Sequence, residues 1–558
     1  MSPPPAPTRT VADAIGEHLA ERGVDQVFGL IGSGNLVVTN ALRRGGARFV
    51  AARHECGAVM MADGWARVSG RVGVCSVHQG PGLTNAITGI AEAAKSRTPL
   101  LVLSGDTPAA ALTSNFRIDQ DALVRSVGAI AERVHAPQTA HADAARALRR
   151  AELERRPVVL SMPIDVQAQP AAQPAAAPSP GPAPVPTAPS PRASDLTAAA
   201  ELLAKARRPL LLAGRGAVLS DAGPAIARLG EACGALLVTT AVAHGIFDGE
   251  PYAIGICGGF ATPLAAELIR DADVIVAFGA TLNHWTTRHG TLLAPDAKLV
   301  QVDCDPLQIG LHHGPDAAVA GDAQLAAWGL FAELARLGAE PSGMRTAELR
   351  EEIAGGGWRD EPFEPSVVAG VIDPRTLSIA LAGLLPHDKN VVVDSGHFTG
   401  WPAMFLDVAD PRAWLFVNGF QAVGLGLGAA IGAAIAAPER VTVAALGDGG
   451  LFLSLAELDS AARTQARLLI VVYDDAGYGA EVHHFGALGH DTEIARHADA
   501  DLAAIARGAG VAATTVRETD DLEAVAAWLR DGAGPLLVDA KVDPGICAGW
   551  LADAFKTG

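Results

Sequence analysis

The stretch 441–479 constrains the fold of this chain more than any other part of the sequence. Two short apolar runs, 441–446 and 468–473, are typical of buried strands, and apolar residues at helical spacing lie between them. Each run is followed by an acidic turn, one containing Asp448 and the other containing Asp475. If the strands are parallel neighbours, both carboxylates face the crevice in which open α/β sheets bind ligands.

The residues of these turns indicate what the crevice would bind. Gly447, Gly449 and Gly450 allow backbone N–H groups to approach an anion at the start of the following helix. Two carboxylates beside a phosphate group favour Mg²⁺, which prefers octahedral oxygen ligands and is often shared with phosphates. A solvated pair of Asp residues at a strand end is the alternative that this stretch leaves open.

The same turns resemble the signature of the thiamine-diphosphate enzymes that act on 2-oxo acids, such as acetohydroxyacid synthase, benzoylformate decarboxylase and pyruvate decarboxylase. That signature is Gly-Asp-Gly, a spacer and Asn-Asn; here the 25 residues 450–474 precede Asp475. The resemblance implies that Mg²⁺ is held by Asp448, Asp475 and the backbone carbonyl of Gly477. Because Asp474-Asp475 replaces Asn-Asn, extra negative charge is expected beside the diphosphate, and ordinary metal affinity is not assumed.

Strand and helix patterns alternate along the rest of the chain, which predicts an α/β protein with three doubly wound parallel-sheet domains. No internal repeat is detectable by eye. The resemblance covers nearly the whole chain and implies that the first domain binds the pyrimidine ring and the third the diphosphate. The predicted segments are an N-terminal domain over 8–166, a Pro/Ala-rich linker over 167–192 that should be extended and mobile, a middle domain over 193–338, a second linker over 339–372 and a C-terminal domain over 373–552.

Composition excludes several classes of partner. The net charge of −18 argues against nucleic acid and anionic membrane surfaces. The six cysteines lack metal-binding spacing and are typical of reduced thiols. The amino-terminal residues form no apolar signal core, and no apolar run is long enough to cross a membrane. We therefore expect a cytoplasmic protein.

Glu55 is the main catalytic candidate. It lies in an Arg-His-Glu sequence directly before a predicted helix, where a Glu is usually a favourable contact with the helix dipole. The family has a Glu in this context that hydrogen-bonds the aminopyrimidine ring of the cofactor. A carboxyl group in a mostly apolar pocket can share a proton with a ring nitrogen. The resemblance thus implies that Glu55 helps the ring to remove the proton from the thiazolium carbon.

Ser33 and His78 each follow a predicted strand of the first domain, so both could lie in one crevice. A turn Ser and a loop His are the alternatives. Benzoylformate decarboxylase has a Ser and a His at the matching places, where the pair handles the substrate carboxylate and relays protons. Acetohydroxyacid synthases lack that His, whereas the stretch 80–85 resembles the synthases. The chain therefore mixes two subfamily patterns.

Further cofactor contacts are implied by the resemblance. The stretch 418–426 is similar to the loop that props the cofactor in its bent conformation, although tight helix–sheet packing is an alternative reading. In this stretch Val423 occupies the propping position and Gln421 lies beside it. The stretch 396–398 matches a loop that touches the diphosphate. The predicted cofactor contacts are Glu55, Gly396, His397, Phe398, Gln421, Val423, Gly447, Asp448, Gly449, Gly450, Asp475 and Tyr478. Tyr478, Glu481, His483 and His484 are predicted to border the substrate.

The middle domain of the synthases carries FAD. The corresponding stretch 279–288 lacks their Phe-Asp-Asp-Arg pattern, so FAD is possible here but not expected.

The resemblance implies a thiamine-diphosphate- and Mg²⁺-dependent enzyme. It would decarboxylate a 2-oxo acid to an enamine and add it to an aldehyde or ketone acceptor, as acetolactate synthase does. His78 favours the alternative of simple decarboxylation with release of an aldehyde. A flavin-linked oxidase and a non-catalytic cofactor-binding protein are further alternatives, and Glu55 argues against the last. The resemblance also implies a homodimer or homotetramer (a dimer of dimers) with each site shared between subunits.

Overall fold

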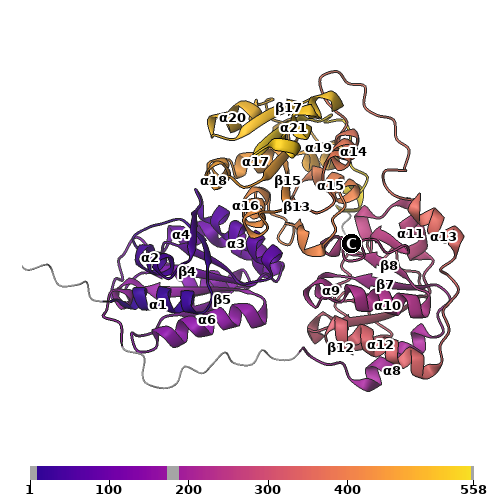
Figure 1. Cartoon of the computed structure of the whole chain (residues 1–558), viewed down its shortest axis with the longest axis horizontal. Helices are drawn as coiled ribbons and strands as arrows, with labels where there is room; N and C mark the ends of the chain where they lie inside the picture. The colour runs from indigo at the N-terminus through magenta and orange to yellow at the C-terminus, as the bar shows by residue number, and fades with distance from the viewer. Residues whose placement is uncertain (1–8, 173–187, 555–558) are drawn as a thin grey trace, which may run out of the picture.

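The computed structural model describes residues 9–172 and 188–554, and its elements form three parallel sheets of six strands each (Figure 1). Every pairing between neighbouring strands is parallel. Helices alternate with the strands and cover the sheets, which confirms the predicted α/β class with three doubly wound domains. In the described part of the chain, no helix is both long and apolar enough to span a membrane.

The N-terminal sheet has the strand order β2-β1-β3-β4-β6-β5. Its strands are short and mostly buried, as expected for a sheet covered on both faces. The elements are α1 (Val11–Glu21), β1 (Gln26–Gly29), α2 (Leu36–Arg44), β2 (Arg48–Ala51), α3 (Glu55–Ser69), β3 (Gly73–Val77), α4 (Pro81–Lys95), β4 (Leu100–Asp106), α5 (Gln120–Ser126), β5 (Ile130–Arg133), α6 (Ala140–Glu154), β6 (Pro157–Pro163) and α7 (Ile164–Gln167).

The middle sheet has the order β12-β11-β10-β7-β8-β9. Counted within the domain this is the 3-2-1-4-5-6 order of dinucleotide-binding folds, read from the other edge. The elements are α8 (Ala193–Leu203), β7 (Pro209–Ala213), α9 (Arg215–Leu219), α10 (Gly223–Cys233), β8 (Leu236–Thr239), β9 (Ala253–Ile256), α11 (Pro263–Arg270), β10 (Val274–Phe278), β11 (Lys298–Asp303), β12 (Ala317–Ala320), α12 (Ala323–Leu337) and α13 (Ala347–Ala354).

The C-terminal sheet has the order β14-β13-β15-β16-β18-β17. The predicted strands β15 and β16 are parallel neighbours, joined through α17 and α18. The elements are α14 (Pro374–Leu384), β13 (Lys389–Val393), α15 (Gly400–Phe405), β14 (Trp414–Phe416), α16 (Gly426–Ala436), β15 (Val441–Gly447), α17 (Asp448–Leu453), α18 (Glu457–Thr464), β16 (Leu468–Asp474), α19 (Gly479–Ala487), α20 (Leu502–Gly508), β17 (Ala512–Val516), α21 (Glu523–Asp531), β18 (Leu536–Lys541) and α22 (Leu551–Ala554).

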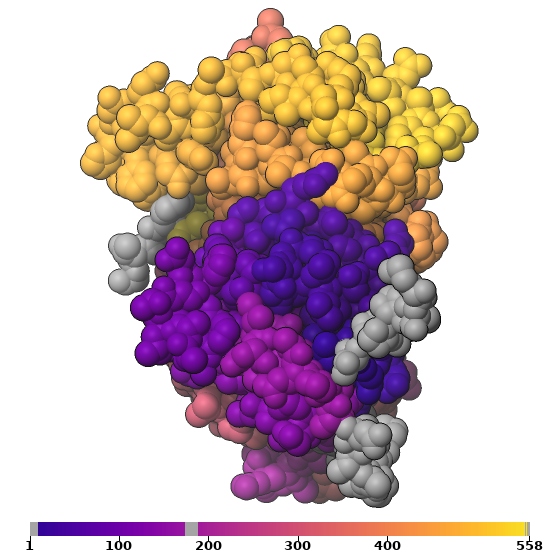
Figure 2. Space-filling model, turned by 90° about the vertical axis from the view of Figure 1, so that its left-hand side faces the viewer, coloured from indigo at the N-terminus to yellow at the C-terminus, as the bar shows by residue number. Residues whose placement is uncertain are grey.

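The two terminal domains are repeats of one topology that the sequence does not reveal by eye. The C-terminal order becomes the N-terminal order when β13 to β18 are renumbered from one. In this correspondence α3, which follows β2, matches α16, which follows β14. The two domains are also neighbours in space (Figure 2), and one apolar core runs through both, from Phe28 and Val59 to Leu427 and Ile470.

The helices α3 and α16 pack backbone to backbone (Figure 1). A Cβ atom added at Gly64 would collide with the carbonyl oxygen of Ala429, and one added at Gly432 would collide with the carbonyl oxygen of Met61. Only glycine permits such a close approach. This contact fixes how the first and third domains lie against each other.

Parts of both predicted linkers form defined contacts with the domains. Residues 173–187 of the first linker lie outside the described residues. On its near side Gln167 is buried and donates to Gly34 O (3.0 Å), and on its far side Pro189 O accepts from Asp322 N (2.8 Å). The second predicted linker includes α13, whose Leu349 and Ile353 pack on the middle domain. Their spacing places both on one helix face, although the polar composition hides this pattern.

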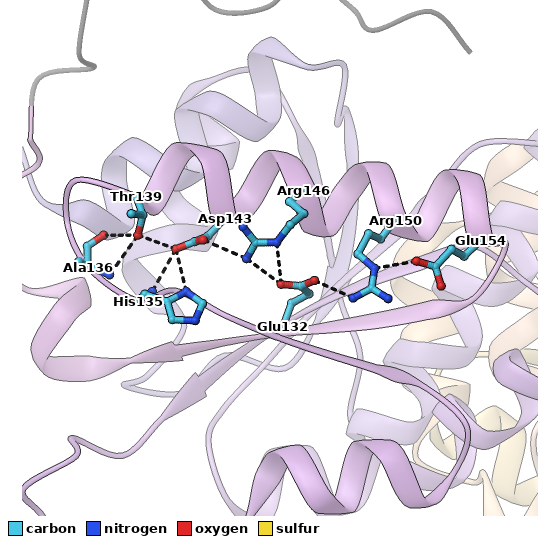
Figure 3. Close-up of polar contacts among 8 residues, drawn as sticks. All are labelled: Glu132, His135, Ala136, Thr139, Asp143, Arg146, Arg150 and Glu154. Atoms are coloured by element: carbon cyan, nitrogen blue, oxygen red, sulfur yellow. Dashed lines mark hydrogen bonds and ion pairs between the residues drawn. The ribbon is translucent and has the colours of Figure 1, made fainter. Parts of the chain in front are cut away.

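A ladder of ion pairs holds α6 onto the edge strand β5 (Figure 3). Glu132 of β5 pairs with Arg146 (2.8 Å) and Arg150 (2.8 Å) of α6. Asp143, also on α6, pairs with Arg146 (2.9 Å) and accepts from His135 N (3.1 Å). The ladder lies on α6 and the β5–α6 connection, so it stabilises the N-terminal domain away from the residues predicted to act on the cofactor.

Candidate active site

Glu55 lies at the first position of α3, directly after the turn that leaves β2. Its side chain is buried, and Asn85 donates from Nδ2 to Glu55 Oε2 at 3.0 Å. A Cβ atom at Gly82 would lie 3.5 Å from Glu55 Oε1 and 3.0 Å from His78 Cβ. The stretch 80–85, singled out in the sequence as synthase-like, therefore forms one wall around Glu55. Asn85 was missed as a contact of Glu55, and its place within that stretch was the available signal.

His78 and the turn that carries Ser33 meet in the same corner. His78 Nδ1 accepts from Gly34 N at 3.1 Å, and the His78 ring packs edge-on against Phe116. A neutral imidazole that accepts at Nδ1 carries its proton on Nε2. Burial lowers the pKa of His78, although the negative charge of Glu55 acts in the opposite direction. Ser33 is exposed in the adjoining turn.

Asp448 and Asp475 follow neighbouring strands at the carboxyl edge of the C-terminal sheet. Asp448 begins α17 after β15, and Asp475 directly follows β16. Burial and the neighbouring carboxylates of Asp475 and Asp474 raise the pKa of Asp448 to about 8. His397 lies at the edge of this group, with Nδ1 3.8 Å from Asp475 Oδ2, while its Nε2 accepts from Ala548 N at 2.9 Å. The structure thus brings together two carboxylates that repel each other.

This donor set fits a divalent cation. A buried carboxyl group with its pKa raised by a second carboxylate is stabilised in its ionised form when a cation lies between them. Within the described ranges, no three His, Cys, Asp or Glu side chains are grouped so that they could hold a metal ion. Asp448, Asp475 and the Gly477 carbonyl would therefore need further oxygen ligands, and a diphosphate supplies such oxygens.

Glycines leave room for a phosphate group around the two turns that carry Asp448 and Asp475. A Cβ atom at Gly449 would lie 2.8 Å from the Tyr478 ring, and one at Gly447 would lie 3.2 Å from the Phe398 ring. A Cβ atom at Gly479 would collide with Asp475 Oδ2. The predicted diphosphate contacts are thus gathered around one cradle, and larger side chains at these glycines would displace its walls.

The loop before α16 is held by Asp394, a residue that sequence reasoning missed. Asp394 is fully buried after β13 and accepts from Gly424 N (2.9 Å) and Leu425 N (3.2 Å). Burial raises the pKa of Asp394 to about 6. A Cβ atom at Gly450 would lie 2.7 Å from Asp394 Oδ2 and 3.5 Å from Val423 Cγ1, so the predicted propping residue lies beside the phosphate cradle. An acidic residue directly after an apolar strand was the available signal.

The extra charge of Asp474 is matched by a lysine. Lys541, at the end of β18, donates from Nζ to Asp474 Oδ2 (2.5 Å) and to Asp499 Oδ1 (2.7 Å). Asp474 Oδ1 accepts from Ala476 N at 3.1 Å, so the same carboxylate also holds the turn that carries Asp475. Burial opposes the charge of Lys541, but Asp474 and Asp499 raise its pKa. Asp474 therefore has an ion-pair partner, and the effect of Asp474-Asp475 on metal affinity stays a prediction.

The residues predicted to border the substrate lie close to this cradle. Tyr478 is exposed and packs edge-on against His497. Glu481 is exposed on the first turn of α19, and the His483 ring lies 4.5 Å from the His397 ring. His484 lies on the same helix and packs against Phe485 instead.

A cleft of about 2860 Å³ opens between the domains, and the two acidic turns, which carry Asp448 and Asp475, line part of it. Among the described residues on its walls are Gly396, His397, Phe398, Gln421, Val423, Gly447, Asp448, Gly449, Gly450, Asp475, Gly477, Tyr478 and Glu481. Ser33, Glu55 and His78 are not among the described residues that line it. The described residues that line this cleft therefore include both acidic turns but not the Glu55 corner.

In the middle domain, the stretch that corresponds to the flavin-binding pattern of the synthases ends at an arginine with contacts inside its own domain. Arg288, in the stretch that corresponds to the flavin-binding pattern, donates from Nε to Gly258 O (2.9 Å) and from Nη2 to Ala261 O (3.0 Å). The side chain is thus used in contacts within its own domain. The expectation that FAD is not bound stays a prediction.

The chain matches three family models in the order of its three sheets. Residues 9–125 match the thiamine pyrophosphate enzyme N-terminal binding domain, residues 196–330 the central domain and residues 394–540 the C-terminal binding domain. Thiamine pyrophosphate is the same compound as thiamine diphosphate. The protein belongs to the thiamine pyrophosphate enzyme family.

Relatives span nearly the whole chain. A probable 2-ketoarginine decarboxylase of Pseudomonas aeruginosa is 33% identical over 543 residues, which cover 95% of this chain and 93% of the relative. The acetolactate synthase large subunit of Parasynechococcus marenigrum is 29% identical over 548 residues, which cover 96% of this chain and 88% of the relative. A sulfoacetaldehyde acetyltransferase of Rhodobacter capsulatus is 29% identical, with coverages of 98% and 96%. The relatives thus include both a decarboxylase and a synthase, and the family acts on 2-oxo acids with thiamine diphosphate.

Proposed function

We propose that this protein is a thiamine-diphosphate- and Mg²⁺-dependent enzyme that decarboxylates a 2-oxo acid and transfers the remaining acyl group to a carbonyl acceptor. The observation that carries the proposal is the pairing of two half-sites in one chain. One holds the buried Glu55 with Asn85 and His78, and the other holds the acidic pair Asp448 and Asp475 in a glycine-lined cradle.

Each half-site has a distinct task in this proposal. Asp448, Asp475 and the Gly477 carbonyl would hold Mg²⁺, and Mg²⁺ would hold the diphosphate. The bound cofactor supplies an electron sink for the carbanion that forms when CO₂ leaves. Glu55 would hold a proton at the aminopyrimidine ring, and Asn85 keeps the Glu55 carboxylate oriented by its hydrogen bond.

His78 would act on the substrate. Because its Nδ1 accepts from Gly34 N, the Nε2–H of the neutral ring is available to donate to a substrate carboxylate or to deliver a proton. Its position beside the wall at Gly82 that also flanks Glu55 favours the second candidate function, in which the carbanion is protonated and an aldehyde is released. The synthase-like Asn85 favours transfer to an acceptor instead.

We further propose that the active unit is a homodimer, or a dimer of dimers, in which Glu55 of one subunit faces the acidic turn of another. The separation of Glu55 from the cleft in one chain supports this assembly. Two equivalent sites would then form across each interface. A cytoplasmic location also stays a prediction.

The experiment is an incubation of the enzyme, loaded with thiamine diphosphate and Mg²⁺, with a panel of 2-oxo acids, each with and without aldehyde acceptors. The panel includes pyruvate and, because of the relative from Pseudomonas aeruginosa, a 2-oxo acid that bears a guanidinium group. Mass spectrometry of the products distinguishes a hydroxyketone or hydroxy acid from a free aldehyde. Failure to release CO₂ from any member would contradict the proposal.

A further inference from the structure

Glu457, the first residue of α18, reaches from the C-terminal domain into the turn that carries Glu55. Its side chain is 1% exposed, and its Oε1 accepts from Arg53 N at 3.1 Å and from His54 N at 2.9 Å. These are the two residues directly before Glu55. A Cβ atom at Gly57 would collide with Glu457 Oε1, so the first turn of α3 lies directly on this carboxylate.

Glu92 of α4 makes the reciprocal contact, from the N-terminal domain to the loop that precedes α16. It is fully buried and accepts from Gly419 N at 3.2 Å and from Phe420 N at 2.7 Å. Gln421, a predicted cofactor contact, follows directly in the chain, and Val423, the predicted propping residue, comes two positions later.

The two glutamates occupy corresponding places in the two domains. Glu92 lies on the helix between β3 and β4, and Glu457 lies on a helix between β15 and β16. Under the shared strand order these connections match, and so do the turns that they hold, β2 to α3 and β14 to α16. Each domain therefore uses the same connection to grip the same turn of the other.

The electrostatic surroundings of the two carboxylates differ. Burial opposes the charge of Glu92, but Arg67, 3.1 Å away, and the Phe420 N–H lower its pKa. Burial raises the pKa of Glu457, whose hydrogen-bond partners are backbone N–H groups and the Ser460 side chain. A carboxylate buried on N–H groups costs free energy unless its geometry is well satisfied. The hydrogen bonds from the Arg53 and His54 N–H groups offset this cost and tie the position of the turn to the carboxylate.

We propose that Glu457 and Glu92 are reciprocal positioning residues, Glu457 for the proton-handling Glu55 and Glu92 for the loop that props the cofactor. The proposal rests on the proposed roles of Glu55 and of that loop. Loss of Glu457 should slow the proton step, whereas loss of Glu92 should weaken binding of the cofactor. A merely structural pair would not produce this division.

The main variant is Glu457→Gln, which keeps the side-chain volume but removes the negative charge and one of the two acceptor oxygens, so the hydrogen bonds from the Arg53 and His54 N–H groups are weakened. With thiamine diphosphate and Mg²⁺ bound, exchange of the thiazolium C2 hydrogen for deuterium should slow by about 10²-fold, because misplacing a reacting group by about 1 Å has an effect of that size. The dissociation constant of the cofactor should stay within about 2-fold of the wild-type value, since a factor of that size is well below 1 kcal/mol. In the cofactor-free protein, the backbone amides of Arg53 and His54 should exchange faster, because Glu457 accepts from both.

Gly57→Ala provides a second perturbation that leaves the charge intact. The added Cβ atom meets the Glu457 carboxylate and should displace it, with the same loss of C2 exchange. The reciprocal variant, Glu92→Gln, should raise the cofactor dissociation constant by about 10-fold, as expected when hydrogen bonds to a charged group are weakened. C2 exchange in the fully loaded Glu92→Gln protein should stay near the wild-type rate.

Asp143→Asn is the matched control, because Asp143 is another buried helix carboxylate that accepts from a backbone N–H, that of His135 (Figure 3). It should lower thermal stability without changing C2 exchange. Wild-type C2 exchange in folded Glu457→Gln and Gly57→Ala would overturn the positioning role, and so would an equal loss in Asp143→Asn. If Glu55→Gln itself exchanged normally, the proposed function of Glu55 would be the part that fails.

Discussion

The N-terminal and C-terminal domains share one strand order but carry different chemistry at the ends of matching strands. His78 follows β3 of the N-terminal sheet, where Asp448 follows the matching strand β15. Glu55 follows β2, where the loop with Val423 follows β14. The comparison teaches that topology decides where the side chains gather, whereas their identity decides which end of a ligand they meet. The groups proposed to handle protons lie on one side, and the acidic pair proposed to hold Mg²⁺ lies on the other.

The strongest test of this division combines the two half-sites. Glu55→Gln should retain the cofactor without turnover, and Asp448→Ala should lose the cofactor, so each variant alone should be nearly inactive. Co-expressed in equal amounts, half of the dimers would be mixed, and each would contain one intact site. About a quarter of wild-type activity should return if pairing is random. Inactive mixed dimers, verified by mass spectrometry with both variants folded, would place the whole site in one chain.

Removal of the metal should affect only the C-terminal half-site. Exhaustive chelation should release the cofactor, because Mg²⁺ would join Asp448 and Asp475 to its diphosphate. Asp475→Asn keeps an oxygen ligand and removes one negative charge, so it should bind Mg²⁺ and cofactor at least as well as wild type. Equilibrium dialysis measures both. Full retention of cofactor after chelation would contradict the metal assignment.

His78→Ala tests the N-terminal half-site alone. Decarboxylation should slow by about 10²-fold, which is typical of the loss of an acid–base group. Cofactor affinity should hardly change, because His78 lies in the Glu55 corner and not in the phosphate cradle. Steady-state kinetics and cofactor titration separate the two effects, and an unchanged rate with every accepted 2-oxo acid would make His78 an ordinary loop residue.

Lys541→Met sharpens the comparison from the C-terminal side, where a charge cluster adjoins the metal turn. Loss of the buried cation should destabilise the fold by about 3–5 kcal/mol, because Asp474 is left as an unpaired buried charge. Adding Asp474→Asn in the same chain should restore much of this stability. Denaturant unfolding reports the outcome. Equal defects in the single and double variants would show that the ion pair with Asp474 is not the interaction through which Lys541 stabilises the fold.

The ion-pair ladder of the N-terminal domain is remote from its half-site and should affect stability alone. Burial opposes the charge of Asp143, but the His135 N–H, Thr139 and Arg146 lower its pKa below the ordinary 3.8. A lowered pKa contributes stability above the unfolded value that is lost as the pH falls through the folded value. The difference of about 1–2 kcal/mol in unfolding free energy between wild type and Asp143→Asn should therefore shrink below pH 4. A constant difference would refute this linkage.

The sequence predicts the parts of this molecule that depend on local pattern. The strands β15 and β16 and the acidic turns after them follow from apolar runs that end at Gly and Asp. Glu457 and Lys541 could not be found in this way. Glu457 lies in an ordinary amphipathic helix, and its partners are some 400 residues away in the chain (404 for Arg53 N). Lys541 ends a strand, and its role depends on the pairing of β16 with β18.

The shared strand order was hidden for a related reason. Strand order is set by which strands pair in space, and no local pattern in the sequence reports that pairing. The helix α13 was missed because only Leu349 and Ile353 on it form an apolar face. Local composition therefore describes the elements better than it describes their assembly.

The backbone contact between α3 and α16 gives the single chain an approximate internal symmetry. The two helices occupy the same place in two copies of one architecture, and they touch at Gly64 and Gly432. Such symmetry by itself would build two equal walls, yet thiamine diphosphate has two chemically unlike ends. Side chains at the strand ends break this symmetry, with Glu55 and His78 in one domain and Asp448 and Asp475 in the other. Two domains with one strand order can thus present an asymmetric ligand with two different surfaces.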